Sequence, residues 1–201
     1  MAELRCHTAL GEDDPTLYLH VTLPSGRVQD IELQPNSWNK EILARPQELL
    51  WASDSKAFFI NGSENAYSGF FVDVYRISDN RVQKVKITNS AQRDMVKSFP
   101  PCAAVNRDEQ ECKEIEANPN FNMSGLSWVS GSSAVIVMAE VPCSSSYGGI
   151  MCQVLGYKLD IPNGKILQRM TARELKHNWQ KSMGWQLRIP DPPVYGPPFK
   201  R

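Results

Sequence analysis

Residues 50–60 read LWASDSKAFFI, and residues 127–137 read SWVSGSSAVIV. In both copies a tryptophan is followed, at the same offsets, by two serines and an alanine, and the alanine is followed by three apolar residues. A small polar segment before an apolar run is typical of a tight turn that leads into a β-strand. Internal repetition of such a unit indicates a repeated supersecondary structure. The repeated segment therefore predicts a β-rich fold in which Trp51 and Trp128 fill the core.

The repeat continues downstream of each tryptophan into paired strands that alternate apolar and polar residues. Three such pairs flank short turns that contain Gly, Asn or Asp: 16–23 with 27–33, 72–77 with 81–87, and 155–161 with 165–167. These turn residues tolerate the positive φ that tight hairpins require. We expect one β-rich domain over residues 1–188, with the internal repeat at about 48–88 and 126–169 and a proline-rich tail at 189–201.

The paired strands predict an all-β fold of antiparallel sheets, with about ten strands in total. A few short helices are expected between them. Residues 106–109 and 171–174 have the spacing of a capping box, in which a side-chain oxygen caps the first turn and a glutamate reaches back to the capping residue.

The tryptophan segment resembles the blade motif of WD-like propeller repeats in exported bacterial proteins, which runs Trp-Ser-Pro-Asp-Gly before an apolar strand. Trp51, Asp54 and the strand 58–60 match this motif, whereas serines replace its Pro and Gly. In the second copy Gly131 stands where Asp is expected. A closed propeller requires at least about four blades, and this chain supplies two copies and an N-terminal half-unit. The resemblance therefore implies a partial propeller or a sandwich-like arrangement, of which we favour the sandwich.

Composition argues against two classes of partner. Lys and Arg number 22, and Asp and Glu also number 22, so the chain carries no net charge that would attract nucleic acid or a membrane surface. No apolar run approaches the roughly 20 residues of a membrane span. We therefore expect no nucleic-acid partner and no membrane span.

The cysteines favour an oxidising compartment. Cys102 with Cys112, and Cys143 with Cys152, would each close a short loop as a disulfide and leave Cys6 over. The four cysteines can pair in three ways, so other pairings stay open, as does a cytosolic protein with reduced thiols. We expect an exported protein, periplasmic or extracellular, from which a signal peptide has been removed.

Catalytic and cofactor motifs are missing from the sequence. His7, His20 and His177 do not have metal-ligand spacing, and there is no nucleophile elbow and no glycine-rich phosphate loop. We therefore expect no cofactor, no metal and no enzymatic activity. A hydrolase that uses a hydroxyl of residues 144–146, or His177, stays open as an alternative.

Two predicted loops offer a binding surface instead, and we call them the first tyrosine segment (residues 61–69) and the second tyrosine segment (residues 142–152). Tyrosine among small polar residues combines a large contact area with adaptable hydrogen bonding. The predicted binding residues are Tyr67, Ser68, Gly69, Ser144, Ser145, Ser146, Tyr147 and Gly148.

The expected function is therefore non-catalytic binding of a protein or glycan. Residues 144–147 are similar in spacing to the Ser/Gly-x-x-Tyr loop that periplasmic inhibitors of invertebrate-type lysozyme insert into the lysozyme cleft. This resemblance implies an inhibitor of a cell-wall hydrolase. A structural module of an envelope assembly, held through the proline-rich tail, is a further alternative, and an oligomer stays open.

Overall fold

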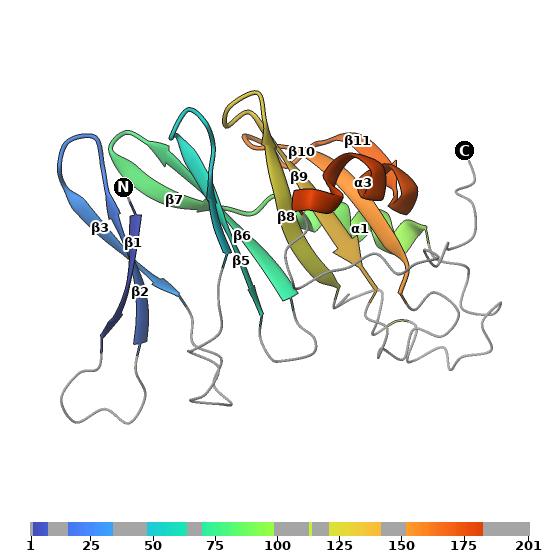
Figure 1. Cartoon of the computed structure of the whole chain (residues 1–201), viewed down its shortest axis with the longest axis horizontal. Coiled ribbons are helices and arrows are strands. Elements are labelled where there is room, and N and C mark those ends of the chain that lie inside the picture. The colour runs from blue at the N-terminus through green and yellow to red at the C-terminus, as the bar shows by residue number, and fades with distance from the viewer. Residues whose placement is uncertain are drawn as a thin grey trace.

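The computed structural model of the chain (Figure 1) describes residues 2–7, 16–33, 48–63, 70–98, 113, 121–141 and 152–182. Within these residues, eleven strands form three antiparallel sheets, accompanied by two α-helices. The prediction of an all-β fold with antiparallel sheets and a few short helices is confirmed. The proline-rich tail and the capping-box spacing at 106–109 lie outside the described residues.

Each sheet is a meander in which consecutive strands pair. The first sheet contains β1 (Ala2–His7), β2 (Thr16–Thr22) and β3 (Val28–Leu33). The second contains β4 (Glu48–Trp51), β5 (Ala57–Ser63), β6 (Phe70–Ser78) and β7 (Arg81–Val85). The third contains β8 (Asn122–Val129), β9 (Ala134–Glu140), β10 (Val154–Asp160) and β11 (Ile166–Thr171). The two tryptophan copies therefore belong to the second and third sheets.

The three sheets stack in chain order, and the second sheet is buried on both faces. Phe58 and Ile60 of β5 lie in a cluster with Leu19 and Val21 of the first sheet. Phe59, between them in sequence, lies in the cluster shared with the third sheet. Successive side chains of a strand point to opposite faces, so a strand between two sheets requires a continuous apolar run. The stack consequently has three sheet layers, one more than the two-sheet sandwich favoured from the sequence.

Both tryptophans pack at a seam between sheets, and both are half-buried. The Trp128 ring lies 5.6 Å from the ring of Phe59 in the second sheet, and its Nε1 donates a hydrogen bond to the carbonyl oxygen of Leu50 at 3.0 Å. The Trp51 ring lies 4.8 Å from that of Phe58, beside the cluster between the first and second sheets. The tryptophans therefore join sheets, at the margin of the core.

The contact between the turn at Asp54 and the turn at Gly131 explains why glycine, and not aspartate, stands at position 131. The carboxylate of Asp54, in the first copy, accepts hydrogen bonds from the backbone N–H and the hydroxyl of Ser132 in the second copy, at 3.0 and 2.8 Å. A Cβ at Gly131 would lie 2.8 Å from an oxygen of that carboxylate, and Gly131 has a φ of 68°. An aspartate at position 131 would also bring two carboxylates together. The second turn thus receives the aspartate of the first copy in place of its own.

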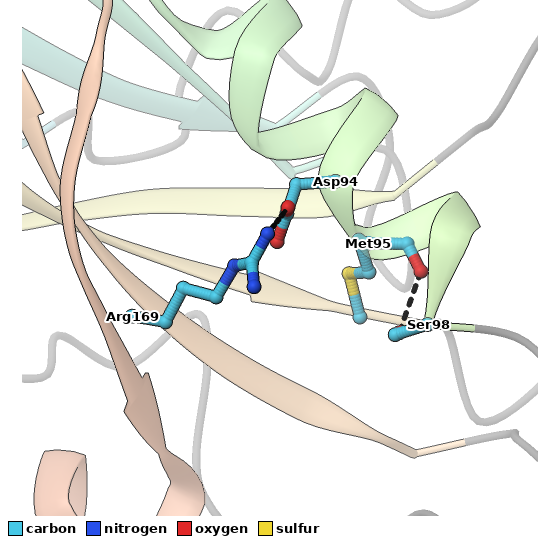
Figure 2. A network of polar contacts seen from close by, with 4 residues as sticks. All are labelled: Asp94, Met95, Ser98 and Arg169. Carbon is cyan, nitrogen blue, oxygen red and sulfur yellow. Dashed lines mark hydrogen bonds and ion pairs between the residues drawn. The ribbon is translucent and has the colours of Figure 1, made fainter. Parts of the chain in front are cut away.

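Helix α1 (Thr88–Lys97) is tied to the third sheet by an ion pair. Figure 2 shows Arg169 of β11 reaching the buried carboxylate of Asp94 on α1. Met95 is fully buried in the cluster that joins the second and third sheets. The Ser98 hydroxyl donates to the Met95 carbonyl at 2.6 Å and so satisfies a carbonyl in the last turn of the helix. Helix α1 therefore helps to close the cluster between these two sheets.

Helix α3 (Ala172–Trp179) covers the far face of the third sheet and is followed by the short 3₁₀ helix η4 (Gln180–Ser182). The predicted capping box is confirmed: the Glu174 N–H donates to the Thr171 hydroxyl, and the Glu174 carboxylate accepts from the Thr171 N–H at 2.7 Å. Leu175 is fully buried over Gly156 of β10, where a Cβ would lie 2.5 Å from the leucine side chain. The glycine allows this close approach, which seats the helix on the sheet.

Candidate functional site

The described strand ends and tight turns lie at two opposite ends of the stack (Figure 1). The strands β1, β5 and β9 end at the lower end in Figure 1, whereas the tight turns at 79–80 and 162–164 lie at the upper end. The first tyrosine segment begins within β5, and the second begins shortly after β9. The described strand ends next to both tyrosine segments therefore lie at the lower end of the stack.

The predicted binding residues themselves lie outside the described residues: Tyr67, Ser68, Gly69, Ser144, Ser145, Ser146, Tyr147 and Gly148. The structure describes the residues that flank them. Ser63 and Phe70 stand on either side of the first tyrosine segment's undescribed part, and Val141 and Cys152 stand on either side of the second's. These flanking residues form the described part of the candidate site.

A single side chain, that of Asn122, connects the bases of the two segments. Its Oδ1 accepts a hydrogen bond from the backbone N–H of Phe70 at 3.2 Å, and its Nδ2 donates to Oε2 of Glu140 at 3.1 Å. Phe70 begins β6 in the second sheet, while Asn122 and Glu140 are paired residues of β8 and β9 in the third. The start of β6 and the end of β9 are thus joined through one amide.

The Glu140 carboxyl at this end of the stack is buried, and its pKa is shifted. Its residue is 8% exposed, and burial raises the pKa of the carboxyl above its ordinary value, while the hydrogen bond from Asn122 opposes part of that rise. Asn122 and Glu140 were not among the predicted site residues. Asn122 begins β8 and Glu140 ends β9, and no local sequence pattern distinguishes either residue. The one sequence signal was an acidic residue at the end of the apolar run 134–139.

Replacing Glu140 with glutamine should change how stability depends on pH. A carboxyl whose folded-state pKa is raised binds its proton more tightly in the folded state. The free energy of unfolding of the wild type should therefore fall as the pH rises from 4.5, the ordinary glutamate value, through the raised pKa. Glu140→Gln keeps an acceptor for Asn122 but cannot ionise, so its stability relative to the wild type should increase across that interval. Urea unfolding at several pH values measures this difference.

Glu174→Gln is the matched control, because the pKa of the Glu174 carboxyl is shifted in the opposite direction from that of Glu140. The backbone and side-chain hydrogen bonds from Thr171 lower the pKa of the Glu174 carboxyl. Its stabilising contribution should be present above the ordinary glutamate pKa and lost as the pH falls through the lowered one. A Glu140→Gln difference that stays constant with pH would show that the Glu140 carboxyl is not perturbed in the folded protein.

Gln153 is a second buried polar residue at this end of the stack, and it faces away from Glu140. Glu140 pairs with Val154, so the neighbouring Gln153 projects from the other face of the sheet. Gln153 is 3% exposed, and its Oε1 has no hydrogen-bond partner among the described residues. The backbone carbonyl of Gln153 accepts from the Val141 N–H at 2.9 Å. Gln153 therefore fixes the base of the second tyrosine segment through its backbone.

The described part of the chain contains neither a metal-binding cluster nor a membrane-spanning helix. There, no group of three or more His, Cys, Asp and Glu side chains is arranged to hold a metal ion. Among the same residues, no helix combines the length and apolarity needed to cross a membrane.

Of the cysteines in the predicted disulfides, Cys152 alone is described. Among the described residues, no pair of cysteines lies at disulfide distance. Cys102, Cys112 and Cys143 lie outside the described residues. The pairings Cys102–Cys112 and Cys143–Cys152 stay predictions.

The residues of the hydrolase alternative are not brought together in the part of the chain that the structure describes. His177 is exposed on α3, which covers the far face of the third sheet, and it makes no hydrogen bond to a serine of the described residues. Residues 144–146 are outside those residues. His20 lies on β2 of the first sheet, where its Nδ1 is 2.5 Å from the Asp30 carboxylate.

Comparison with protein-family models, with curated proteins and with solved structures found no match to this chain. The resemblances to WD-like propeller repeats and to lysozyme inhibitors accordingly stay predictions.

Proposed function

We propose that the protein is an exported, non-catalytic binding module that engages a protein or glycan partner with both tyrosine segments at once. One observation carries the proposal: the backbone N–H of Phe70 and the carboxylate of Glu140 hydrogen-bond to the same Asn122 amide. Two segments that leave adjacent, mutually fixed strand ends present their tyrosines to one partner. Fixing the ends also lowers the entropy that must be lost when the partner binds.

The composition of the segments favours insertion into a cleft of the partner. Tyr67 and Tyr147 would supply rigid aromatic contact area, and the neighbouring serines and backbone groups would supply hydrogen bonds. A cell-wall hydrolase, whose cleft binds a glycan, is the partner class that the Ser-x-x-Tyr spacing of residues 144–147 suggests. Occupation of that cleft would inhibit the hydrolase without any chemistry by the inhibitor.

Alanine substitutions in the tyrosine segments test the proposal. Purified invertebrate-type lysozyme and an array of cell-wall glycans serve as probes, and affinity is measured by calorimetry. Tyr67→Ala and Tyr147→Ala should each weaken binding at least about thirtyfold, the cost of losing a central aromatic anchor. Val28→Ala, which truncates an exposed apolar residue of the first sheet, should bind as the wild type does.

Two outcomes would contradict the proposal. In one, both tyrosine variants bind the probe as tightly as the wild type does. In the other, the wild type binds neither the lysozyme nor any glycan of the array. Unfolding midpoints of all variants, measured alongside, show whether each variant remains folded.

Export is part of the proposal and has its own test. The paired spacing of Cys102 with Cys112 and of Cys143 with Cys152 supports an oxidising compartment. Thiol titration of the denatured protein, purified without reductant from the extracellular or periplasmic fraction, should find one free cysteine of the five. Five free thiols would contradict the assignment to an oxidising compartment.

A further inference from the structure

We propose that the surface where α1 lies beside β11 is a docking site for an acidic, extended segment of a partner protein. We call this surface the basic flank and define it by three cations, Arg93, Lys97 and Arg169, all of which are described residues. The basic flank contains none of the residues of the tyrosine segments, so the inference does not depend on the proposed function.

Two contacts show which side of α1 faces β11. The Ser90 hydroxyl donates to the carbonyl of Gly164 at 2.5 Å, in the turn that leads into β11. The Asp94 carboxylate, four residues further along the helix, pairs with Arg169 of β11 (Figure 2). Residues four apart lie on one side of a helix. The side of α1 that carries Ser90 and Asp94 therefore lies along β11.

The two exposed cations of α1 lie on this same side. Lys97 follows Ser90 by seven residues, which is about two turns of helix, and Arg93 lies four residues before Lys97. Neither cation forms an ion pair with a described residue. Nε of Arg93 donates only to the backbone carbonyl of Asn89, at 3.2 Å, so the charge of the guanidinium stays uncompensated.

Arg169 completes the basic flank with a guanidinium whose orientation is already fixed. Its Nη2 pairs with Asp94, a carboxylate whose side chain is only 9% exposed, while the arginine side chain itself is 59% exposed. Within the described residues, the other donors of this guanidinium make no hydrogen bond. A second carboxylate can therefore pair with the exposed edge of the same planar group. Because Asp94 already holds the arginine, little side-chain entropy would be lost on binding.

The strand beside these cations favours an extended partner. Among the described strands, β11 pairs with β10 alone, so it is an edge strand. Its residues Leu167, Gln168 and Arg169 are exposed in succession, and Leu167, at 50% exposure, adds apolar contact area. An extended segment can add to such an edge through main-chain hydrogen bonds, while its alternate side chains give specificity.

The spacing of the cations favours acidic residues at alternate positions of that segment. Alternate side chains of a strand lie about 7 Å apart on one face. Arg93 and Lys97 are about 6 Å apart along the helix axis. Carboxylates at every second position can thus meet successive cations of the basic flank.

Fluorescence anisotropy with a short labelled peptide of alternating glutamate and threonine tests the proposal on the full chain. The wild type should bind this peptide at low salt, and should bind the peptide with glutamine in place of each glutamate at least about tenfold more weakly. Arg93→Glu and Lys97→Glu should each weaken binding of the acidic peptide about tenfold, because each places a like charge on the basic flank. Arg27→Glu is the matched control: it makes the same charge change at an exposed turn of the first sheet and should change the affinity less than about twofold.

Arg169→Lys tests the role of the planar group. Lysine keeps the positive charge and can still pair with Asp94, but it lacks the fork that binds a second carboxylate. This variant should bind the acidic peptide about fivefold more weakly than the wild type, with an unfolding midpoint close to that of the wild type. Unfolding midpoints of the two glutamate variants, whose substituted residues are exposed, show that they remain folded.

Three results would overturn the proposal. The wild type might not bind the acidic peptide, or might bind the glutamine peptide equally well. The two glutamate variants of α1 might bind the acidic peptide as tightly as Arg27→Glu does. Polygalacturonate, which carries carboxylates on a glycan that cannot pair with a strand edge, should bind at least about tenfold more weakly than the peptide; tighter binding of this glycan, lost in both variants of α1, would assign the basic flank to a glycan instead.

Discussion

Replacing Asn61 with alanine is expected to lower the free energy of unfolding by about 3 kcal/mol, because buried backbone groups would be left unpaired. Asn61 is 1% exposed. Its Nδ2 donates to the carbonyl of Gly125 and to the Glu48 carboxylate, and its Oδ1 accepts from the Gly125 N–H. Alanine at position 61 removes the hydrogen-bond partners of the Gly125 N–H and carbonyl, which are buried between the second and third sheets.

Urea unfolding, with the midpoint and the slope both recorded, measures this effect. Asn163→Ala is the matched control: this asparagine makes one hydrogen bond, to Asp160, in an exposed turn. Its substitution should cost less than about 1 kcal/mol. If Asn61→Ala lowered the free energy of unfolding no more than Asn163→Ala does, the backbone of Gly125 would have other partners. The contact described between Asn61 and Gly125 would then be incorrect.

Replacing Leu175 with alanine is the second change with a large expected effect, again about 3 kcal/mol. Leu175 is 0% exposed and lies in the cluster between α3 and the third sheet, directly over Gly156. Truncation loses buried apolar area and opens a cavity above the glycine. Leu167→Ala, which shortens a half-exposed leucine of β11, should cost less than about 0.5 kcal/mol.

A double-mutant cycle makes this test specific to the contact. Gly156→Ala alone should destabilise by about 1–3 kcal/mol, because its Cβ would overlap the leucine side chain. In the Leu175→Ala background the same substitution should fill part of the cavity and restore stability. Additive effects of the two substitutions would show that Leu175 does not lie over Gly156.

Features with a local sequence signal were predicted successfully. The capping box at Thr171 and Glu174 was predicted because the spacing of a capping residue and its glutamate is set within one helical turn. The strand pairs were predicted because alternation of apolar residues has a period of two. The apolar run at 58–60 predicts a strand. Its length alone does not indicate that Phe58 and Phe59 face different sheets.

The residues that join the sheets had no such signal. The Gln29 side chain pairs with the backbone of Val82 in the neighbouring sheet, where its Oε1 accepts from the N–H at 2.8 Å and its Nε2 donates to the carbonyl at 3.0 Å. Asn61 pairs with both backbone groups of Gly125 in the same way, and Asn122 accepts from the Phe70 N–H of the neighbouring sheet. A polar residue in a strand ordinarily indicates a solvated face, and its partner in another sheet is not visible from the residues around it.

The central claim is that the second and third sheets stack with β8 against β5 and β6, so that the described strand ends next to both tyrosine segments lie at one end of the stack. The most direct test is a NOESY spectrum that correlates the Gly125 α protons with the ring of Phe59. A Cβ at Gly125 would lie 2.9 Å from ring atoms of Phe59, so a strong cross-peak is expected. Its absence, with both resonances assigned and sharp, would contradict the stacking and, with it, a binding site shared by the two segments.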